Sequence, residues 1–126
     1  MTKFESLQIV RVYQDIEHRN TDYRMLVDRL WPRGISKVQL ELNYWAKELA
    51  PSTELRKWYD HQLVRFDPFR VRYLTELANP DLSDTIEMLT DQTTCNRLVL
   101  LTATKDLDHS SASVLYEFLA LKLLND

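Results

Sequence analysis

The chain has 126 residues, of which 44% are hydrophobic and 28% charged, and its formal net charge is −3. This length suits one domain whose core needs neither disulfide nor metal, and no apolar run approaches the roughly 18 residues of a membrane span. The N-terminus lacks the apolar core of a secretory signal, and the lone Cys95 cannot form an internal disulfide. We therefore expect a single domain over residues 1–126, cytoplasmic and without a membrane partner.

The charges are unevenly distributed along the chain. Residues 29–72 hold nine Lys and Arg against five Asp and Glu, whereas residues 73–126 hold three against nine. The middle segment therefore carries +4 and the C-terminal segment −6. A basic segment can attract phosphate-bearing partners, and it can equally be one of two solvated faces of opposite sign.

Three segments rich in β-branched, aromatic and other apolar residues are expected to form strands: residues 7–13, 25–30 and 98–101. The last two contain apolar runs typical of strands that are covered on both faces. This predicts an α/β fold: a small, mostly parallel sheet of about three or four strands with helices on both faces, in a Rossmann-like three-layer arrangement. Only eleven residues, 14–24, connect the first two strands, so a hairpin is the alternative to a parallel crossover.

Five helices are expected after the second strand. Ser36 and Gln39 form a capping box, and Val38, Leu42, Trp45 and Leu49 follow at helical spacing, which predicts a helix that ends at Pro51. Ser52 is the expected N-cap of a short helix, Thr53–Tyr59. Asp67 and Pro68 begin a third helix that ends near residue 79. A fourth spans about 82–89, and a buried fifth spans 112–124.

No cofactor or metal ion is expected. Gly34 is the only glycine, which excludes glycine-rich phosphate loops and dinucleotide fingerprints. Asp106, Asp108 and His109 lie close together in the sequence, but their spacing matches no diagnostic metal motif.

Residues 28–34, DRLWPRG, are the most informative part of the chain. In residues 31–34, proline occupies the second place and glycine the fourth. This pattern predicts a type I turn directly after a strand, and the turn would hold Arg33 outward. Ligands of open α/β sheets bind beyond the carboxyl ends of the strands, where this turn would lie. The planar guanidinium groups of Arg29 and Arg33 suit phosphate or carboxylate, and Lys37 adds a cation in the next helix. Asp28 either orients an arginine of this site or pairs with one across the sheet.

The end of the third strand supplies further candidates. If the second and third strands are parallel, residues 102–109 face the Arg33 turn. Thr102 and Thr104 can bind a phosphate oxygen, and His109 can act as an acid or base. Alternatively this segment only leads into the last helix, with Asp108 or Ser110 as its cap.

A second polar cluster occupies residues 52–61 and includes Arg56 and His61. Basic residues at the end of a short helix also complement the helix dipole, so a purely structural role is the alternative.

The motif 26–34, LVDRLWPRG, followed by residues 50–52, 55–58 and His61, closely resembles the YeaO-like bacterial proteins, a part of domain-of-unknown-function family 488. The resemblance extends over nearly the whole chain. It implies a small cytoplasmic α/β protein and supplies no established activity.

The chain departs from the related proteins at several positions. They usually have glycine before the arginine that enters the second strand, where this chain has residues 22–24, DYR. They often have glycine before the histidine that corresponds to His61, where this chain has Asp60. Near the last helix they tend to have His-Asn-His-Ala where this chain has residues 109–112, HSSA. The resemblance to more distant branches of the family implies that those branches have cysteines, and could use a thiol, at the positions of Thr102 and Ser110. A thiol mechanism therefore cannot operate here, which weakens the case for catalysis more than the case for binding.

The first hypothesis is a pocket for a small anionic, phosphate-bearing molecule. Arg29, Arg33 and Arg56 would hold the anion, and His61 and His109 would be the candidate proton-transfer groups.

Two alternatives remain open. The basic segment 29–72, with Trp31, Trp58 and Tyr59, can form a nucleic-acid-binding module, which needs an extended positive face. A partner-binding protein would instead show a broad exposed apolar patch and no polar pocket. The sequence indicates no particular oligomeric state.

Overall fold

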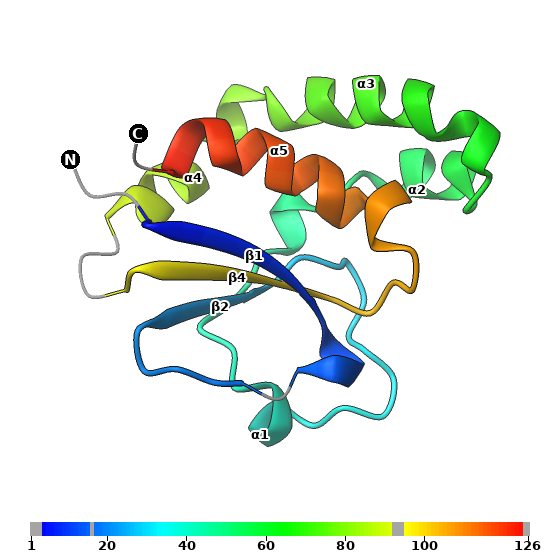
Figure 1. Cartoon of the computed structure of the whole chain (residues 1–126). Coiled ribbons are helices and arrows are strands. Elements are labelled where there is room, and N and C mark those ends of the chain that lie inside the picture. Colours follow the sequence, from blue (N-terminus) through cyan, green and yellow to red (C-terminus); the bar gives the residue numbers. More distant parts are fainter. Residues whose placement is uncertain (1–3, 16, 92–94, 125–126) are drawn as a thin grey trace.

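A computed structural model describes residues 4–15, 17–91 and 95–124. Within them a sheet of four parallel strands has the order β1 (Ser6–Arg11), β4 (Arg97–Thr102), β2 (Asp22–Leu26) and β3 (Tyr44–Trp45). Figure 1 shows the three longer strands side by side beneath the helices. The small parallel α/β fold predicted from the sequence is confirmed.

The last strand along the chain, β4, occupies the middle of the sheet. Its six residues are all buried, and it pairs with β1 from Ser6↔Arg97 to Arg11↔Thr102 and with β2 from Asp22↔Arg97 to Leu26↔Leu101. Because β4 separates β1 from β2 and runs parallel to both, the hairpin alternative for the first two strands is wrong.

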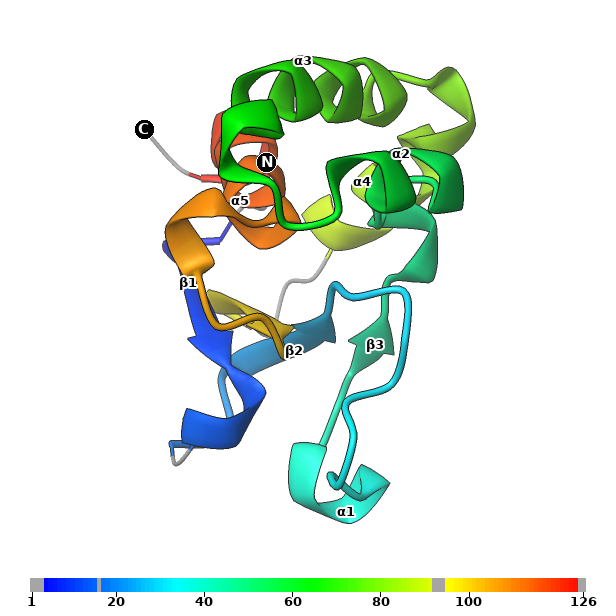
Figure 2. The ribbon, with the colours of Figure 1, turned by 90° about the vertical axis from the view of Figure 1, so that its right-hand side faces the viewer.

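The two faces of the sheet are covered differently. Alternate residues such as Met25 and Leu100 pack against helices on one face. These helices are α2 (Thr53–Tyr59), α3 (Phe66–Leu77), α4 (Ser83–Thr90) and α5 (Ser111–Leu123). Leu26 and Val99 face a smaller cluster with Val12 and with Leu40 of α1 (Lys37–Leu40). Figures 1 and 2 show α1 on the opposite side of the sheet from the other helices.

Single 3₁₀ turns fill five of the connections: η1 (Val12–Gln14), η2 (Lys47–Leu49), η3 (Leu63–Arg65), η4 (Pro80–Leu82) and η5 (Leu107–His109). The short polar caps expected from the sequence are present at two helix starts. Ser52 Oγ accepts from Leu55 N at 3.1 Å, and Ser110 Oγ accepts from Ser113 N at 3.3 Å. The third helix begins one residue before the expected Asp67, which lies in its first turn.

The predicted helix from Ser36 to Pro51 is wrong beyond its first turn. The capping box at Ser36 and Gln39 forms, but Glu41 adopts a left-handed conformation (φ 49°) and ends α1. The chain then adds β3 to the exposed edge of β2, where Asn43 N donates to Arg24 O and Ala46 N to Leu26 O. Pairing with an open strand edge satisfies these backbone groups at least as well as a helix does, and tertiary contacts override the helical spacing.

The segment after β2 also differs from its prediction. The strand ends at Leu26 rather than Leu30, although Val27 N still donates to Leu101 O. The turn is centred on Arg33 and Gly34, one residue later than expected. Gly34 has φ 79°, which is typical of the third place of a type II turn, not the predicted type I, and it is a conformation that glycine adopts without strain.

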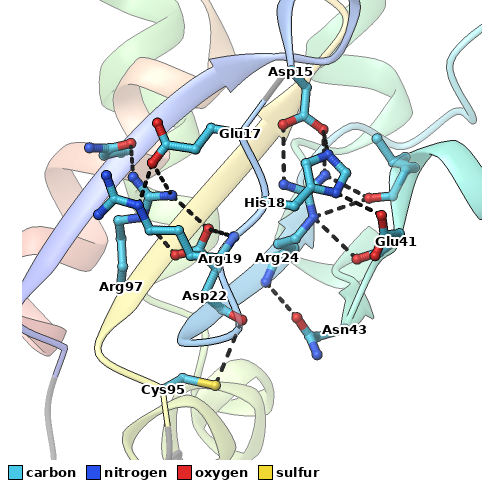
Figure 3. Close-up of polar contacts among 12 residues, drawn as sticks. Asp15, Glu17, His18, Arg19, Asp22, Arg24, Glu41, Asn43, Cys95 and Arg97 are labelled. Atoms are coloured by element: carbon cyan, nitrogen blue, oxygen red, sulfur yellow. Dashed lines mark hydrogen bonds and ion pairs between the residues drawn. The ribbon is translucent and has the colours of Figure 1, made fainter.

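Two buried arginines fasten the connection between β1 and β2 (Figure 3). The Arg97 guanidinium donates two hydrogen bonds of 2.6 Å to the Asp22 carboxylate. Arg24 binds the Asp15 carboxylate and the carbonyl oxygen of Leu40. His18 lies between the carboxylates of Asp15 and Glu41, at 3.1 and 2.8 Å. These contacts tie Asp15, residues 17–22 and the end of α1 to the first residues of β2 and β4.

The Asp22–Arg97 pair predicts a specific acid sensitivity. Hydrogen bonding to Arg97 lowers the pKa of Asp22 below its ordinary value. The carboxylate therefore stabilises the fold above the unfolded-state pKa, and this contribution is lost as the pH falls through the folded-state pKa. Asp22→Asn should lower the free energy of unfolding near pH 7 by up to about 3 kcal/mol, and the difference from the wild type should shrink toward pH 3 in urea titrations.

Asp108→Asn is the matched control, because Asp108 is an exposed acidic residue. If the difference in unfolding free energy between Asp22→Asn and the wild type does not change with pH, this role of the ion pair is contradicted.

Candidate functional site

A cavity of about 740 Å³ opens at the carboxyl edge of the sheet. Its floor is formed by the segments that leave the adjacent strands β2 and β4. Residues of α2, η3 and α3 and Tyr13 of η1 complete its wall. This is the place where open parallel sheets bind ligands.

Eight of the nine residues predicted for the site line this cavity. They are Asp28, Arg29, Arg33, Arg56, His61, Thr102, Thr104 and His109. The ninth, Lys37, does not, because residues 35–36 carry the chain to α1 on the opposite face of the sheet. The expectation that Lys37 adds a cation to this site is therefore wrong.

The carboxylate of Asp28 ties the ends of β2 and β4 together. It accepts from Thr102 Oγ1 at 2.7 Å and from Ala103 N at 2.8 Å. Its own carbonyl oxygen accepts from Trp45 Nε1 at 2.7 Å, which links β3 to the same point. The sequence predicted that Asp28 binds an arginine, either of this site or across the sheet. Both predictions are wrong, because no arginine in the described part of the chain pairs with this carboxylate. Burial raises the pKa of Asp28, although the two hydrogen bonds favour its charged form.

Three arginines line the cavity without an ion-pair partner among the described residues: Arg29, Arg33 and Arg56. The Arg29 guanidinium is half-buried and donates to the carbonyl oxygen of Pro51 at 3.1 and 3.3 Å. Arg33 and Arg56 are exposed, and the Arg33 backbone is held by a hydrogen bond from Tyr13 Oη to its carbonyl oxygen. Their guanidinium groups are free to bind an anion in the cavity.

His109 is oriented by Asp106. Its Nδ1 lies 2.9 Å from Asp106 Oδ2, and its backbone N–H donates to Asp106 Oδ1 at 3.3 Å. The His109 carbonyl oxygen accepts from Tyr59 Oη at 2.7 Å, and the ring packs edge-on against Phe66. A ring fixed at Nδ1 leaves Nε2 to meet a ligand.

His61 owes its position to two left-handed residues after α2. Asp60 (φ 46°) is the C-cap of that helix, and His61 itself has φ 54°. Left-handed C-caps favour glycine, and this chain has Asp60 at that position.

The hydroxyls of Thr102 and Ser110 serve the fold. Thr102 Oγ1 donates to Asp28 and accepts from Thr104 N at 3.3 Å. Ser110 Oγ donates to the carbonyl oxygen of Leu107 at 2.7 Å and caps α5. Both residues are buried. The Ser110 hydroxyl donates to a backbone carbonyl and not to a base. The Thr102 hydroxyl does donate to a carboxylate, but Asp28 also accepts from Ala103 N, so this contact joins the ends of the two strands.

Several lining residues were missed by the sequence interpretation, among them Tyr13, Lys105, Asp106 and Leu63. A signal existed for Tyr13 and Lys105, since each follows the end of a parallel strand and such ends meet at one edge of the sheet. Leu63 follows no strand, so only the folded chain places it here.

The aromatic residues considered for nucleic-acid stacking are largely covered. Tyr59 is buried, and Trp31 packs edge-on against Trp45. Trp58 is half-buried under the Arg72 guanidinium, 4.1 Å from its ring centre. Nearby, the Glu76 carboxylate accepts from Ser52 N and Oγ at 2.8 and 2.6 Å.

No group of three or more His, Cys, Asp or Glu suited to a metal ion occurs among the described residues. In the same part of the chain, no helix is long and apolar enough to cross a membrane.

Comparisons with known proteins place the chain among bacterial relatives. A family model described as "Inactive DUF488-N3 subclade" matches residues 6–126. The Escherichia coli protein "Uncharacterized protein YeaO" is 42% identical over 114 residues, which cover 90% of this chain and 96% of that protein. The Mycobacterium tuberculosis protein "Uncharacterized protein Rv3073c" is 39% identical over 119 residues, covering 94% and 98%. No solved structure matches the chain.

The role of Asp28 can be tested by two substitutions. Asp28→Ala leaves the Ala103 N–H and the Thr102 hydroxyl without their acceptor and should lower the free energy of unfolding by about 1–3 kcal/mol. Asp28→Asn keeps an acceptor and removes a buried charge, so it should lower the free energy of unfolding near pH 7 by less than Asp28→Ala does. Urea titrations of both variants measure the difference.

The pH dependence of Asp28→Asn gives a second readout. Because burial raises the folded-state pKa of Asp28, this carboxyl contributes stability that is present below the unfolded-state pKa and lost as the pH rises through the folded-state pKa. Raising the pH from about 3.5 to 7 should therefore shift the relative stability in favour of Asp28→Asn. A shift in the opposite direction would rule out burial as the dominant influence on this group.

Proposed function

The chain belongs to the DUF488 family, in the subclade described as inactive, and from this premise we propose that it binds a small anionic, phosphate-bearing molecule in the cavity beside Asp28. One observation carries the proposal. Arg29, Arg33 and Arg56 converge on a cavity at the carboxyl edge of a parallel sheet, and no described carboxylate pairs with any of them. Guanidinium groups that lack a carboxylate partner are suited to bind phosphate oxygens in pairs.

The charges around the cavity favour an anion. Lys105 adds a fourth cation to the lining. Of the two lining carboxylates, Asp28 is occupied by donors from β4 and the loop after it, and Asp106 by His109. The four cations of the lining outnumber its two carboxylates, and this excess of positive charge favours a phosphate next to the arginines.

Binding without turnover fits the site better than catalysis. The subclade is described as inactive, and the Thr102 and Ser110 hydroxyls are engaged in hydrogen bonds of the fold. His61 and His109 remain in the proposal as ligand contacts through their rings. The cytoplasm is the location we propose.

Inorganic phosphate is the first probe. Arg33→Ala and Arg56→Ala should each weaken phosphate binding about tenfold or more in isothermal titration calorimetry, because a hydrogen bond to a charged group contributes about 1.5–3 kcal/mol. Arg19→Ala is the matched control, since Arg19 is an exposed arginine outside the cavity that pairs with Glu17. Equal phosphate affinity for the wild type and both cavity variants would refute the proposed site.

The same proposal predicts that a bound phosphate ester stays intact. A phosphorus NMR spectrum of methyl phosphate incubated with the protein should show no free inorganic phosphate. Release of phosphate that is abolished by His109→Ala would show that the site is catalytic and contradict binding alone.

A nucleic-acid-binding module would behave differently in titrations with salt. Neutralising several backbone phosphates makes affinity fall steeply as salt rises. Oligonucleotide affinity that is steeply salt-dependent and insensitive to Arg33→Ala would favour that alternative over the cavity.

A further inference from the structure

Three exposed apolar side chains lie in the wall of the cavity. Tyr13 is 46% exposed, Leu30 64% and Leu63 59%. They come from three separate parts of the chain: η1, the loop after β2, and η3. We call these three residues the apolar rim.

Single exposed apolar residues are common on protein surfaces and need no explanation. The other large exposed ones in the described chain are Val38, Val64, Val71 and Leu121, and none of them lines this cavity. The three residues of the apolar rim differ from such single residues, because three separate segments bring them to one cavity. Apolar surface that lines a cavity is typical of a site that covers an apolar group of a ligand.

Aromatic and aliphatic side chains continue the rim into the cavity. Trp31, Pro32, Tyr59 and Phe69 line it as well. Tyr59 and Phe69 are stacked with their ring centres 4.4 Å apart, which makes this part of the wall flat and rigid.

The cations are interleaved with this apolar surface. Leu30 and Trp31 directly follow Arg29, and Arg33 is two residues beyond Trp31. A ligand that reaches the arginines therefore also contacts the apolar wall. The cavity volume of about 740 Å³ falls in the range of about 300–1,000 Å³ typical of pockets for drug-sized molecules.

We propose that the ligand carries its anionic group on an apolar, ring-bearing body, as an aryl phosphate does, and that the apolar rim recognises this body. This inference rests on the proposed function and deepens it by naming the ligand class. The arginines account for the anion, and the rim accounts for the ring. Inorganic phosphate and polyphosphates satisfy only the arginines and leave the rim in water.

Methyl phosphate and phenyl phosphate form the decisive pair of probes, because they share the anionic group and differ in the apolar body. Covering a phenyl ring with apolar side chains should make phenyl phosphate bind about tenfold more tightly or more in calorimetric titrations. Phenol, which lacks the phosphate group, should bind more weakly than phenyl phosphate.

Adjacent residues of η3 provide a matched pair of variants. Leu63→Asn should reduce the preference for phenyl over methyl phosphate and leave the methyl phosphate affinity unchanged. Val64→Asn, at an exposed residue that does not line the cavity, should leave both affinities unchanged. Leu30→Asn is a second rim variant with the same expected effect, and thermal unfolding checks that each variant folds.

The outcomes separate the inference from the proposed function. If methyl and phenyl phosphate bind equally and Arg33→Ala weakens both, the anion site stands and the apolar recognition is wrong. If neither probe binds, the proposed function itself fails, and this inference with it. If light scattering shows that the wild type self-associates and Leu63→Asn does not, the rim is a contact between copies of the chain, which also overturns the inference.

Discussion

The hydrogen bonds of one carboxylate hold the candidate site together. Asp28 directly follows the end of the β2 ladder, and its side chain accepts from Thr102 Oγ1 and Ala103 N at the end of β4. Parallel strands share backbone hydrogen bonds along their length, but the loops beyond their carboxyl ends have no such ladder. The Asp28 contacts extend the pairing past the last ladder bond, and the Trp45 indole attaches β3 to the same residue. Arg29, Arg33, Thr104 and Lys105 all leave this junction on short segments, so its geometry sets where their side chains lie.

This arrangement combines a buried carboxylate with arginines that do not neutralise it. Two hydrogen bonds, rather than an ion pair, partly offset the cost of burying the Asp28 charge, which leaves the guanidinium groups available. Elsewhere the chain pairs its buried arginines fully, as Arg24 with Asp15 and Arg97 with Asp22 (Figure 3). The contrast between these paired arginines and the unpaired ones at the cavity is the physical basis for our proposal of an anion site.

The family context agrees with binding as the proposed role. The subclade is described as inactive, and in this chain the hydroxyls at positions 102 and 110 are buried and take part in a strand junction and a helix cap. A side chain already committed to two hydrogen bonds of the fold cannot serve as a nucleophile without disturbing the structure. The cavity is lined by cations and apolar residues from several segments of the chain.

The sequence by itself determined the features that depend on neighbouring residues. The apolar runs of β2 and β4, the caps Ser36, Ser52 and Ser110, and eight of the residues that line the cavity were predicted, because strand burial, capping and guanidinium chemistry are properties of short segments. Only the tertiary structure decided the rest. Residues 41–49 left their helical pattern because the edge of β2 offered backbone partners, and residues 35–36 carry the chain to α1, so that Lys37 does not line the cavity. The partner of Asp28, and the meeting of Tyr13, Leu30 and Leu63, depend on strand order and on residues far apart in sequence, which no local pattern encodes.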